Sequence, residues 1–309
     1  MEEKKLDGLI PAIVVPLKED YSLDERVFQE YLSHIISFPI KGIAINTDAG
    51  EGYLFSPEER KRILWLTKRI VGDKIPIICG LGGGSTLGLV ELGREFRDLG
   101  ADYFLVFPHP TFKGGREGED KLIINFHEEI SRIGVPLIIF QLQEALGGVM
   151  YNLPTLRKLL DIDGVVAIKE ASFDALLFRN TVYFIRSLKK RIVILTGNDN
   201  FIPESFLLGS DGALIGFGSV FTDIQVKSIR LIKEGKYREG FSLFGKIEEI
   251  CRICFSNPVR DYRVRIKEIL VAQKIFPRST VRPPLTPLSP EEQDLIHKLV
   301  SHMKRYGGE

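Results

Sequence analysis

A lysine stands at the end of a strongly apolar run in VVAIKEAS, residues 165–172. Apolar residues suited to a buried strand lead directly into Lys169, after which the chain turns polar. An apolar environment disfavours the ammonium form, so it lowers the pKa of a lysine and leaves more neutral amine. A neutral amine can attack a carbonyl group, and the protonated imine that results stabilises an adjacent carbanion. The alternative is a structural lysine that pairs with a carboxylate or extends its amine to water.

Asp48 is the second candidate for chemistry, because it follows the apolar run 42–47 at the expected end of another strand. A carboxylate opposite Lys169 can carry a proton during imine formation. It can also pair with the lysine, which would raise the pKa of the amine and hinder its attack. As an anion it would repel a substrate carboxylate, so a substrate with a neutral or cationic group at this point is an alternative.

Further polar residues also follow predicted strands. His109 is a proton carrier suited to neutral pH, and Glu144 is a loop carboxylate that could reach the same place. Their structural alternatives are a packed or interface histidine and a solvated loop residue. Asn198 and Asp199, in TGND, either line the site or cap the following helix. Gln141 can orient a substrate but cannot titrate, and Glu170 should point away from the lysine because side chains alternate along a strand.

Eight short runs rich in β-forming residues recur along the chain, and their starts lie 20 to 34 residues apart. Most are continuously apolar, which is typical of parallel strands buried on both faces. Helical patterns fill the gaps between them. The runs are 8–15, 42–47, 75–80, 102–107, 135–140, 164–169, 192–196 and 212–216.

The clearest helical start signal is SPEER, where Ser56 can cap a helix, Pro57 suits its first position and Glu59 completes a capping box. Eight strand–helix alternations without a break in composition favour an α/β fold. We predict a (β/α)8 TIM barrel over residues 1–222, in preference to an open doubly wound sheet. Active sites of such barrels collect at the C-terminal ends of the strands, so Lys169 should lie at the mouth.

The strand signal stops after residue 222, and residues 223–309 are predicted to form a C-terminal helical region. Two long segments, 223–255 and 258–276, have amphipathic patterns, and a proline-rich connector leads to a last helix at 290–305. We expect this region to pack on the barrel or on another subunit. Cys251 and Cys254 form a CxxC here, but no second ligand pair accompanies them, so helix packing is favoured over a metal or redox site.

The composition excludes several classes of function. A net charge of +1 gives no indication of nucleic-acid or anionic-membrane binding, and 44% hydrophobic residues are typical of a globular protein. The charged N-terminus lacks an apolar signal region, and no apolar run approaches a membrane span. Three cysteines do not make a disulfide framework, so we expect a cytoplasmic enzyme that acts on a small molecule without a cofactor or metal.

Segments of the chain fall in the order and spacing of one known family: GLIPAIVVPL, AGEGYLFSPEERKRIL, GLGGGSTLGLVELGREFRDLGADYFLVFP, GVPLIIF, GVVAIKEAS, LTGND and GSDGALIG. They resemble the dihydrodipicolinate synthase/N-acetylneuraminate lyase family from Leu9 to Gly218. The resemblance implies a class I aldolase-type barrel that forms a Schiff base with pyruvate or another 2-oxo acid and assembles as a homo-oligomer, a tetramer or a dimer. Lys169 matches the imine-forming lysine. The implied substrate-binding positions are Thr47, Ala49, Phe140, Gln141 and Leu214.

The chain departs from the family pattern at its proton-transfer positions. Phe140 stands where the resemblance implies a proton-shuttling tyrosine, and Asp48 and Ala49 replace two threonines. Pro110 falls at the second relay tyrosine, and Ala145 at the arginine that grips the aldehyde substrate of the synthases. Carboxylate recognition and acid–base assistance each contribute several kcal/mol to a barrier, so we predict that the chain is not a true dihydrodipicolinate synthase.

Three hypotheses for function remain. The first is a Schiff-base lyase, of aldolase or dehydratase type, acting on a 2-oxo acid through Lys169. The second is a non-catalytic binding or regulatory barrel that kept the fold and lost the chemistry. The third is a phosphate-ligand barrel that uses the glycine-rich segment GLGGGST, residues 80–86, although a tight turn is the favoured interpretation of that segment. The retained lysine favours the first.

Overall fold

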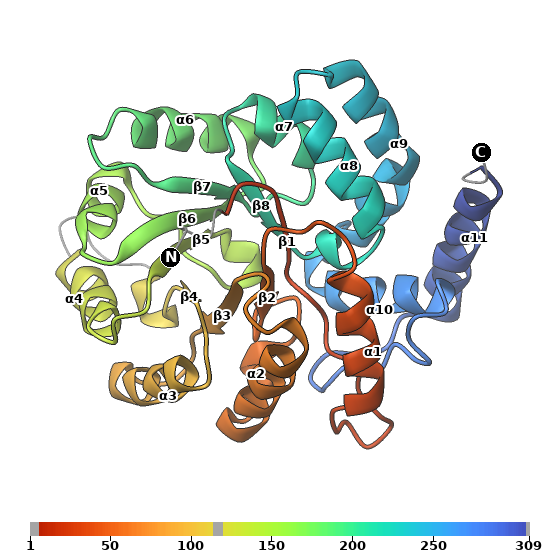
Figure 1. The fold of residues 1–309 in the computed structure, drawn as a ribbon, viewed down its shortest axis with the longest axis horizontal. Helices are drawn as coiled ribbons and strands as arrows, with labels where there is room; N and C mark the ends of the chain where they lie inside the picture. Colours follow the sequence, from red (N-terminus) through yellow and green to blue (C-terminus); the bar gives the residue numbers. More distant parts are fainter. Residues whose placement is uncertain (1–5, 114–119, 307–309) are drawn as a thin grey trace.

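Eight parallel strands form a nearly closed barrel at the centre of the protein (Figure 1). The structure is a computed structural model that describes residues 6–113 and 120–306. Neighbouring strands follow the order β1-β8-β7-β6-β5-β4-β3-β2, and a parallel bridge between Ala12 and Ala44 joins the two ends. The predicted (β/α)8 TIM barrel is therefore confirmed. The strands are β1 (Leu9–Pro11), β2 (Ile43–Ile45), β3 (Ile77–Leu81), β4 (Tyr103–Val106), β5 (Leu137–Leu142), β6 (Val165–Ala171), β7 (Val193–Thr196) and β8 (Gly212–Ile215).

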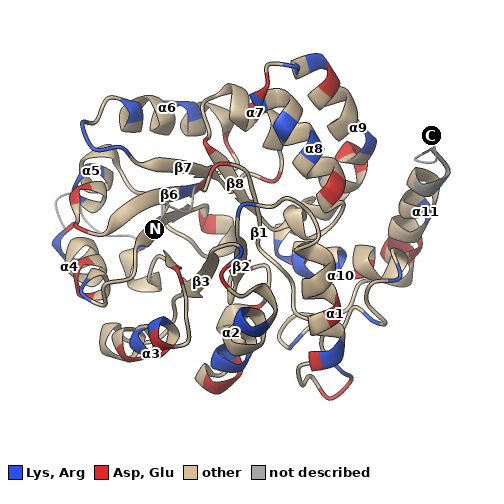
Figure 2. Ribbon diagram, in the orientation of Figure 1, with Lys and Arg blue, Asp and Glu red and all other residues tan. Residues whose placement is uncertain are grey.

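Helices connect the strands and surround the barrel, and most charged residues lie on these helices while the strands are largely uncharged (Figure 2). The predicted capping box is present at the start of α2. The Ser56 hydroxyl accepts a hydrogen bond from the Glu59 amide at 3.2 Å, and the Glu59 carboxylate accepts one from the Ser56 amide at 2.8 Å. The barrel helices are α1 (Glu25–Ile35), α2 (Pro57–Val71), α3 (Thr86–Asp98), α4 (Asp120–Ser131), α5 (Leu153–Asp161), α6 (Ala175–Arg186), α7 (Ile202–Leu207) and α8 (Thr222–Lys233).

Two strands at the site run further than the sequence pattern indicated. β5 continues past Phe140 to Leu142, and β6 continues past Lys169 to Ala171. In the parallel ladder Phe140 is the register partner of Lys169. Each of these two residues therefore points to the same side of the sheet, and the residue after each points to the other side.

The C-terminal region consists of α9 (Tyr237–Cys254), α10 (Tyr262–Ala272) and α11 (Pro290–Tyr306), with α11 at the edge of the molecule in Figure 1. The predicted boundary at residue 222 coincides with the start of α8. That helix completes the eighth βα unit and contacts β1, so we propose that the barrel includes it. Cys251 and Cys254 are buried on α9, and the Cys251 thiol donates to the Asp199 carbonyl at 3.1 Å.

The prediction that the segment containing α10 is amphipathic is wrong for the helix itself. Nine successive residues, 262–270, are buried, and charged side chains are among them. Lys267 forms a fully buried ion pair with Glu51 and donates to the Thr280 carbonyl at 2.8 Å. The other Glu51 carboxylate oxygen accepts from the Arg282 amide at 2.8 Å. Charges on this helix therefore face partners inside the protein, not solvent.

In the described part of the chain, no helix is both long and apolar enough to cross a membrane. No three His, Cys, Asp or Glu side chains among the described residues lie together as a metal-binding group.

We predict that Glu51→Gln destabilises the protein by roughly 3–5 kcal/mol, because it leaves the Lys267 ammonium buried without a counter-charge. The free energy of unfolding in urea measures the loss. Glu51→Leu combined with Lys267→Met should recover much of it, since no buried charge remains. The matched control is Glu30→Gln, which removes an exposed partner of Arg26 and should change stability by less than about 0.5 kcal/mol. A loss below about 1 kcal/mol for Glu51→Gln would contradict the role of the pair.

Candidate active site

Lys169 projects into a small cavity at the C-terminal ends of the barrel strands. Its side chain is largely buried, with 8% of the residue exposed. Gly197 makes room for it, since a Cβ there would lie 2.6 Å from the Lys169 Cε. This inner cavity has a volume of about 20 Å³. Its lining residues are Ala12, Asp48, Ala49, Phe140, Leu142, Leu146, Lys169, Ala171, Phe173, Gly197, Asp199, Gly216, Phe255 and Tyr262.

Burial dominates the electrostatics of the Lys169 amine. It lowers the pKa of Lys169 to about 8, although the carboxylates of Asp199 and Asp48 act in the opposite direction. The Lys169 Nζ lies 4.4 Å from the centre of the Phe140 ring, an aromatic neighbour that has no proton to exchange. A substantial fraction of the amine is therefore neutral near physiological pH, which is the form that attacks a carbonyl.

Asp199 is a second titratable group in the inner cavity. Burial raises the pKa of its carboxyl group to about 7, while a hydrogen bond from the Phe217 amide at 2.8 Å and the charge of Lys169 act to lower it. A carboxyl group that titrates near neutrality can both give and accept protons at working pH. The sequence predicted that Asp199, like Asn198, either lines the mouth of the barrel or caps the following helix. In the structure Asp199 lines the lysine cavity.

Asp48 lies in both the inner cavity and the chamber outside it, and its ion-pair partner is Arg263 on α10. Arg263 binds the Asp48 Oδ1 and also donates from Nε to the Asp48 carbonyl at 2.9 Å. The Tyr262 hydroxyl donates to the Asp48 Oδ2 at 2.7 Å. The carboxylate that was predicted opposite Lys169 is thus held by two residues of the C-terminal region.

Tyr262 and Arg263 are site residues that sequence reasoning missed. The phenol ring of Tyr262 stacks on Phe255, with centroids 5.1 Å apart, and its hydroxyl lies at the Asp48 carboxylate. Gly216 leaves space for the ring, because a Cβ there would lie 3.1 Å from it. Burial, followed by the charge of Asp48, raises the pKa of Tyr262 well above its usual value, so its hydroxyl stays protonated. The available signal was the run of charges in an otherwise apolar helix.

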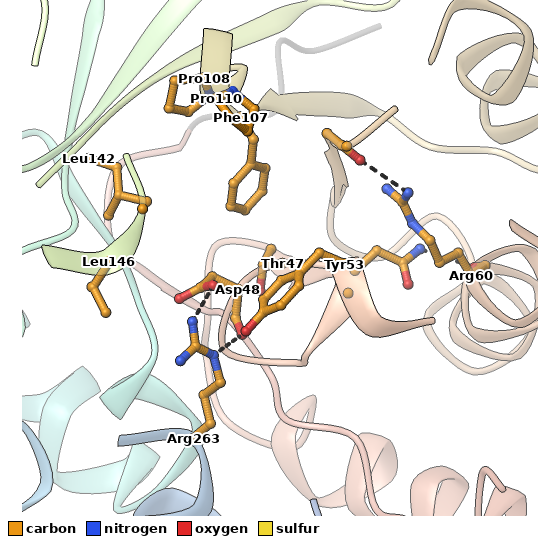
Figure 3. A pocket seen from close by; sticks show the side chains of 15 residues that line it. Thr47, Asp48, Tyr53, Arg60, Phe107, Pro108, Pro110, Leu142, Leu146 and Arg263 are labelled. Carbon is orange, nitrogen blue, oxygen red and sulfur yellow. Dashed lines mark hydrogen bonds and ion pairs between the residues drawn. The ribbon is translucent and has the colours of Figure 1, made fainter. Parts of the chain in front are cut away.

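A larger chamber of about 350 Å³ adjoins the inner cavity and shares Asp48, Leu142 and Leu146 with it (Figure 3). Thr47 lines this chamber, and its buried hydroxyl has no hydrogen-bond partner among the described residues. Arg60 is buried in the chamber wall and donates to the Gly80 carbonyl at 2.8 Å. The full lining is Asn46, Thr47, Asp48, Gly52, Tyr53, Arg60, Gly82, Gly83, Phe107, Pro108, Pro110, Leu142, Leu146, Gly147 and Arg263.

Gln141 and Asn198 lie on the other side of the sheet, behind the cavity. Gln141 follows Phe140 in the alternation of β5, and its amide lies 3.4 Å from the Glu170 carboxylate. Asn198 donates to that carboxylate at 2.8 Å and accepts from the Phe173 amide at 2.6 Å. Neither residue lines the inner cavity or the chamber. The sequence predicted that both residues would line the site, but neither does. Asn198 does not cap α7 either, because Phe201 is at that position. Glu170 does point away from the lysine, as its place in the strand predicted.

The remaining predicted positions divide between the cavity and its surroundings. Ala49 and Phe140 line the inner cavity, whereas Leu214 is buried within β8 and does not line either space. His109 uses both ring nitrogens locally, with Nε2 3.1 Å from the Gly84 carbonyl and Nδ1 2.7 Å from the Thr111 hydroxyl. Glu144 is exposed at the start of the 3-10 turn Glu144–Leu146. Loop geometry thus keeps the histidine and this glutamate out of both spaces.

The other tyrosine near β5, Tyr151, lies after the strand has ended, in the segment that leads into α5. Asn152 caps α5, where its side chain accepts from the Thr155 amide at 2.8 Å. Tyr151 packs near His127, with ring centroids 6.3 Å apart, and does not line either space. The position beside Lys169 therefore belongs to Phe140.

The model of the Dihydrodipicolinate synthetase family matches residues 5–303. The chain belongs to this family. Among curated relatives, an uncharacterized DapA-like lyase of Pyrococcus abyssi is 24% identical over 281 residues, which cover 90% of this chain and 92% of the relative. Another uncharacterized DapA-like lyase, from Pyrococcus horikoshii, is 26% identical over 298 residues, which cover 96% of this chain and 100% of the relative.

Solved structures of the dihydrodipicolinate synthetase family and of a lyase share the fold. YagE, a prophage protein of E. coli K12 crystallised with pyruvate, has a TM-score of 0.87 and 21% identity, covering 96% of this chain and 98% of its own. N-acetylneuraminate lyase from Fusobacterium nucleatum has a TM-score of 0.82 and 22% identity, covering 96% of this chain and 99% of its own. The barrel together with its C-terminal helices is thus common to these proteins.

We predict that the Lys169 amine titrates with a midpoint near pH 8, well below an exposed lysine. Competitive labelling with an amine-reactive anhydride, read by peptide mass spectrometry across pH, measures this midpoint. Asp199→Asn should move the midpoint to lower pH, because a carboxylate that favours the ammonium form has been removed.

Glu144→Gln is the matched control and should leave the midpoint unchanged, because Glu144 is exposed and does not line the cavity. A wild-type midpoint above about pH 10 would contradict a neutral Lys169 amine.

Proposed function

We propose that this protein is a lyase of aldolase or dehydratase type that forms a Schiff base between Lys169 and the carbonyl carbon of pyruvate or another 2-oxo acid. The observation that carries the proposal is a buried amine, with a pKa lowered to about 8, facing a cavity that adjoins a larger chamber. The family to which the chain belongs and the lyase names of its curated relatives support the same reaction class.

The chemistry begins when the neutral Lys169 amine adds to the ketone to give a carbinolamine. Loss of water then forms the iminium ion, and this step needs a proton for the departing hydroxide. Asp199 is suited to supply it, because its carboxyl group has a pKa of about 7 and lines the same cavity. The iminium nitrogen then accepts the electron pair released when a bond to the neighbouring carbon breaks.

The two spaces restrict how a substrate can bind. About 20 Å³ beside the amine holds little more than one water-sized group. The carbonyl end of the substrate therefore enters the inner cavity, and the rest occupies the chamber of about 350 Å³. Phe107, Leu142 and Leu146 give this chamber apolar walls, while the unpaired Thr47 hydroxyl offers a polar contact. We infer a substrate larger than pyruvate alone.

We do not expect dihydrodipicolinate synthase activity. Phe140 beside the amine cannot carry a proton, and exposed Ala145 offers no guanidinium for an aldehyde substrate. YagE, which shares the fold, was crystallised with pyruvate, and this makes pyruvate the first 2-oxo acid to test here.

Reduction with borohydride tests the Schiff base directly. Incubation with pyruvate or a longer 2-oxo acid followed by borohydride should leave a stable adduct, and peptide mapping should place it on Lys169. Lys169→Arg retains a cation of similar length but should abolish the adduct, because a guanidinium is not a nucleophile at this pH. Lys158→Arg, on an exposed helix position, is the matched control and should leave the adduct intact. Failure with a varied set of 2-oxo acids would favour the non-catalytic binding barrel instead.

We also propose that the protein is a cytoplasmic homo-oligomer. Its cysteines, Cys79, Cys251 and Cys254, are free and buried, as suits a reducing compartment. Leu176 and Tyr183 on α6 are 64% and 66% exposed and lie seven residues apart, on one helix face. A second copy of the chain that covered these side chains would remove apolar surface from water.

Light scattering after size exclusion tests the assembly. The wild type should elute as a dimer or tetramer, and Leu176→Glu with Tyr183→Glu should shift it toward the monomer by burying charge at the contact. Leu122→Glu, which alters an exposed leucine on α4, is the control and should not change the mass. A monomeric wild type at micromolar concentration would contradict the proposal.

A further inference from the structure

Two titratable side chains other than the lysine and Asp199 line the inner cavity, Tyr262 and Asp48, and they are joined by a hydrogen bond of 2.7 Å. We propose, on the basis of the Schiff-base function above, that the Tyr262 oxygen accepts the proton from the carbon next to the imine. As it does so, Tyr262 transfers its own hydroxyl proton to the Asp48 carboxylate. Tyr262 would then be a catalytic residue supplied by the C-terminal region, and Asp48 and Arg263 its positioning residues.

The hydrogen-bond arrangement gives the proton a defined direction. Arg263 occupies the Asp48 Oδ1, so the Oδ2 is left to accept from the Tyr262 hydroxyl. A second bond from Arg263 Nε to the Asp48 carbonyl, at 2.9 Å, fixes the backbone of the same residue. The phenol is the donor of the pair, and its oxygen retains lone pairs that can accept a proton from a bound substrate.

The proposed step balances as follows in the iminium formed by Lys169 and a 2-oxo acid. The C3–H bond breaks, and its proton goes to the Tyr262 oxygen as the hydroxyl proton of Tyr262 goes to the Asp48 Oδ2. The C3–H electron pair becomes the C2=C3 bond of an enamine, and the electron pair of the C2=N π bond moves to nitrogen. Positive charge on the iminium and negative charge on Asp48 are both neutralised, and the reverse transfer restores them.

Other groups near the amine are less suited to this step. Phe140 has no exchangeable proton, and Gln141 lies behind the cavity. Asp199 accepts from the Phe217 amide on the β7–β8 side, whereas Tyr262 and Asp48 approach from α10 and the loop after β2. The two carboxylates thus come from different segments of the barrel, and we assign Asp199 to the imine nitrogen and the Tyr262–Asp48 pair to the carbon.

The test separates imine formation from carbon deprotonation, with pyruvate as the probe. Borohydride trapping reports the imine on Lys169, and loss of the pyruvate methyl proton signal in D₂O, followed by NMR against a protein-free blank, reports exchange at C3. Tyr262→Phe should keep the adduct and slow exchange by about a hundredfold or more. Tyr151→Phe is the matched control, since its buried hydroxyl has no hydrogen-bond partner among the described residues, and both signals should be unchanged.

Asp48→Asn removes the acceptor of the relay and should also slow exchange by about a hundredfold. If the two groups act as a unit, the double variant with Tyr262→Phe should be no slower than either single variant, a non-additivity that a merely structural role would not produce. Thermal unfolding of each variant shows that the protein is folded.

Exchange by folded Tyr262→Phe within about threefold of wild type overturns the assignment of this residue. Loss of the Lys169 adduct in Tyr262→Phe also overturns the assignment, because Tyr262 would then be needed for imine formation and not for deprotonation of the carbon. If the double variant slows exchange by the product of the two single-variant factors, the relay between Tyr262 and Asp48 is overturned. A wild type that gives no adduct with any 2-oxo acid overturns the proposed function itself, and the relay with it.

Discussion

Burial of the Lys169 amine is the constraint on which the proposed Schiff-base chemistry depends, because a lysine kept fully charged could not attack a carbonyl. Two carboxylates lie near enough to favour the ammonium form, yet burial outweighs both and holds the pKa of Lys169 at about 8. A carboxylate with no other partner would favour the ammonium form more strongly, because nothing would offset its charge. Arg263 limits this by engaging Asp48 as its own ion-pair partner. The guanidinium on α10 therefore favours the neutral amine that the proposed Schiff base requires.

The C-terminal region contributes to the site through the loop that follows β2. α10 holds this loop at two points, with Arg263 bound to Asp48 and Lys267 bound to Glu51. The loop also carries non-glycine residues in the left-handed region, Asn46 at φ 53° and Glu51 at φ 59°. Such conformations cost of order 1–3 kcal/mol each and persist only where the surroundings fix them. The buried ion pairs on α10 supply that restraint, and the loop in turn presents Asp48 to the cavity.

Much of the barrel and its central lysine could be predicted from sequence, because continuous apolar runs and capping signals depend on local physics. The side-chain assignments at strand ends were less secure. Since alternation has a period of two, continuation of β5 beyond Phe140 places Gln141 on the opposite side of the sheet. Contacts between distant segments leave only indirect signals in the sequence. Tyr262 and Arg263 belong to a segment with an amphipathic pattern and a run of charges, and only the packing of α10 against the β2 loop reveals that they meet Asp48.

The charge balance of the chamber changes what kind of substrate the site favours. Asp48 alone would repel a substrate carboxylate, which made a neutral or cationic substrate an alternative. With Arg263 paired to Asp48, that repulsion is largely compensated. Arg60, buried in the chamber wall, donates to the carbonyls of Gly80 and Gly82, and no carboxylate is paired with it among the described residues. The charged side chains that line the chamber therefore sum to a net positive value, and a buried positive charge without a counter-ion favours the entry of an anion. This charge balance supports the proposed anionic 2-oxo acid over a cationic or neutral carbonyl compound.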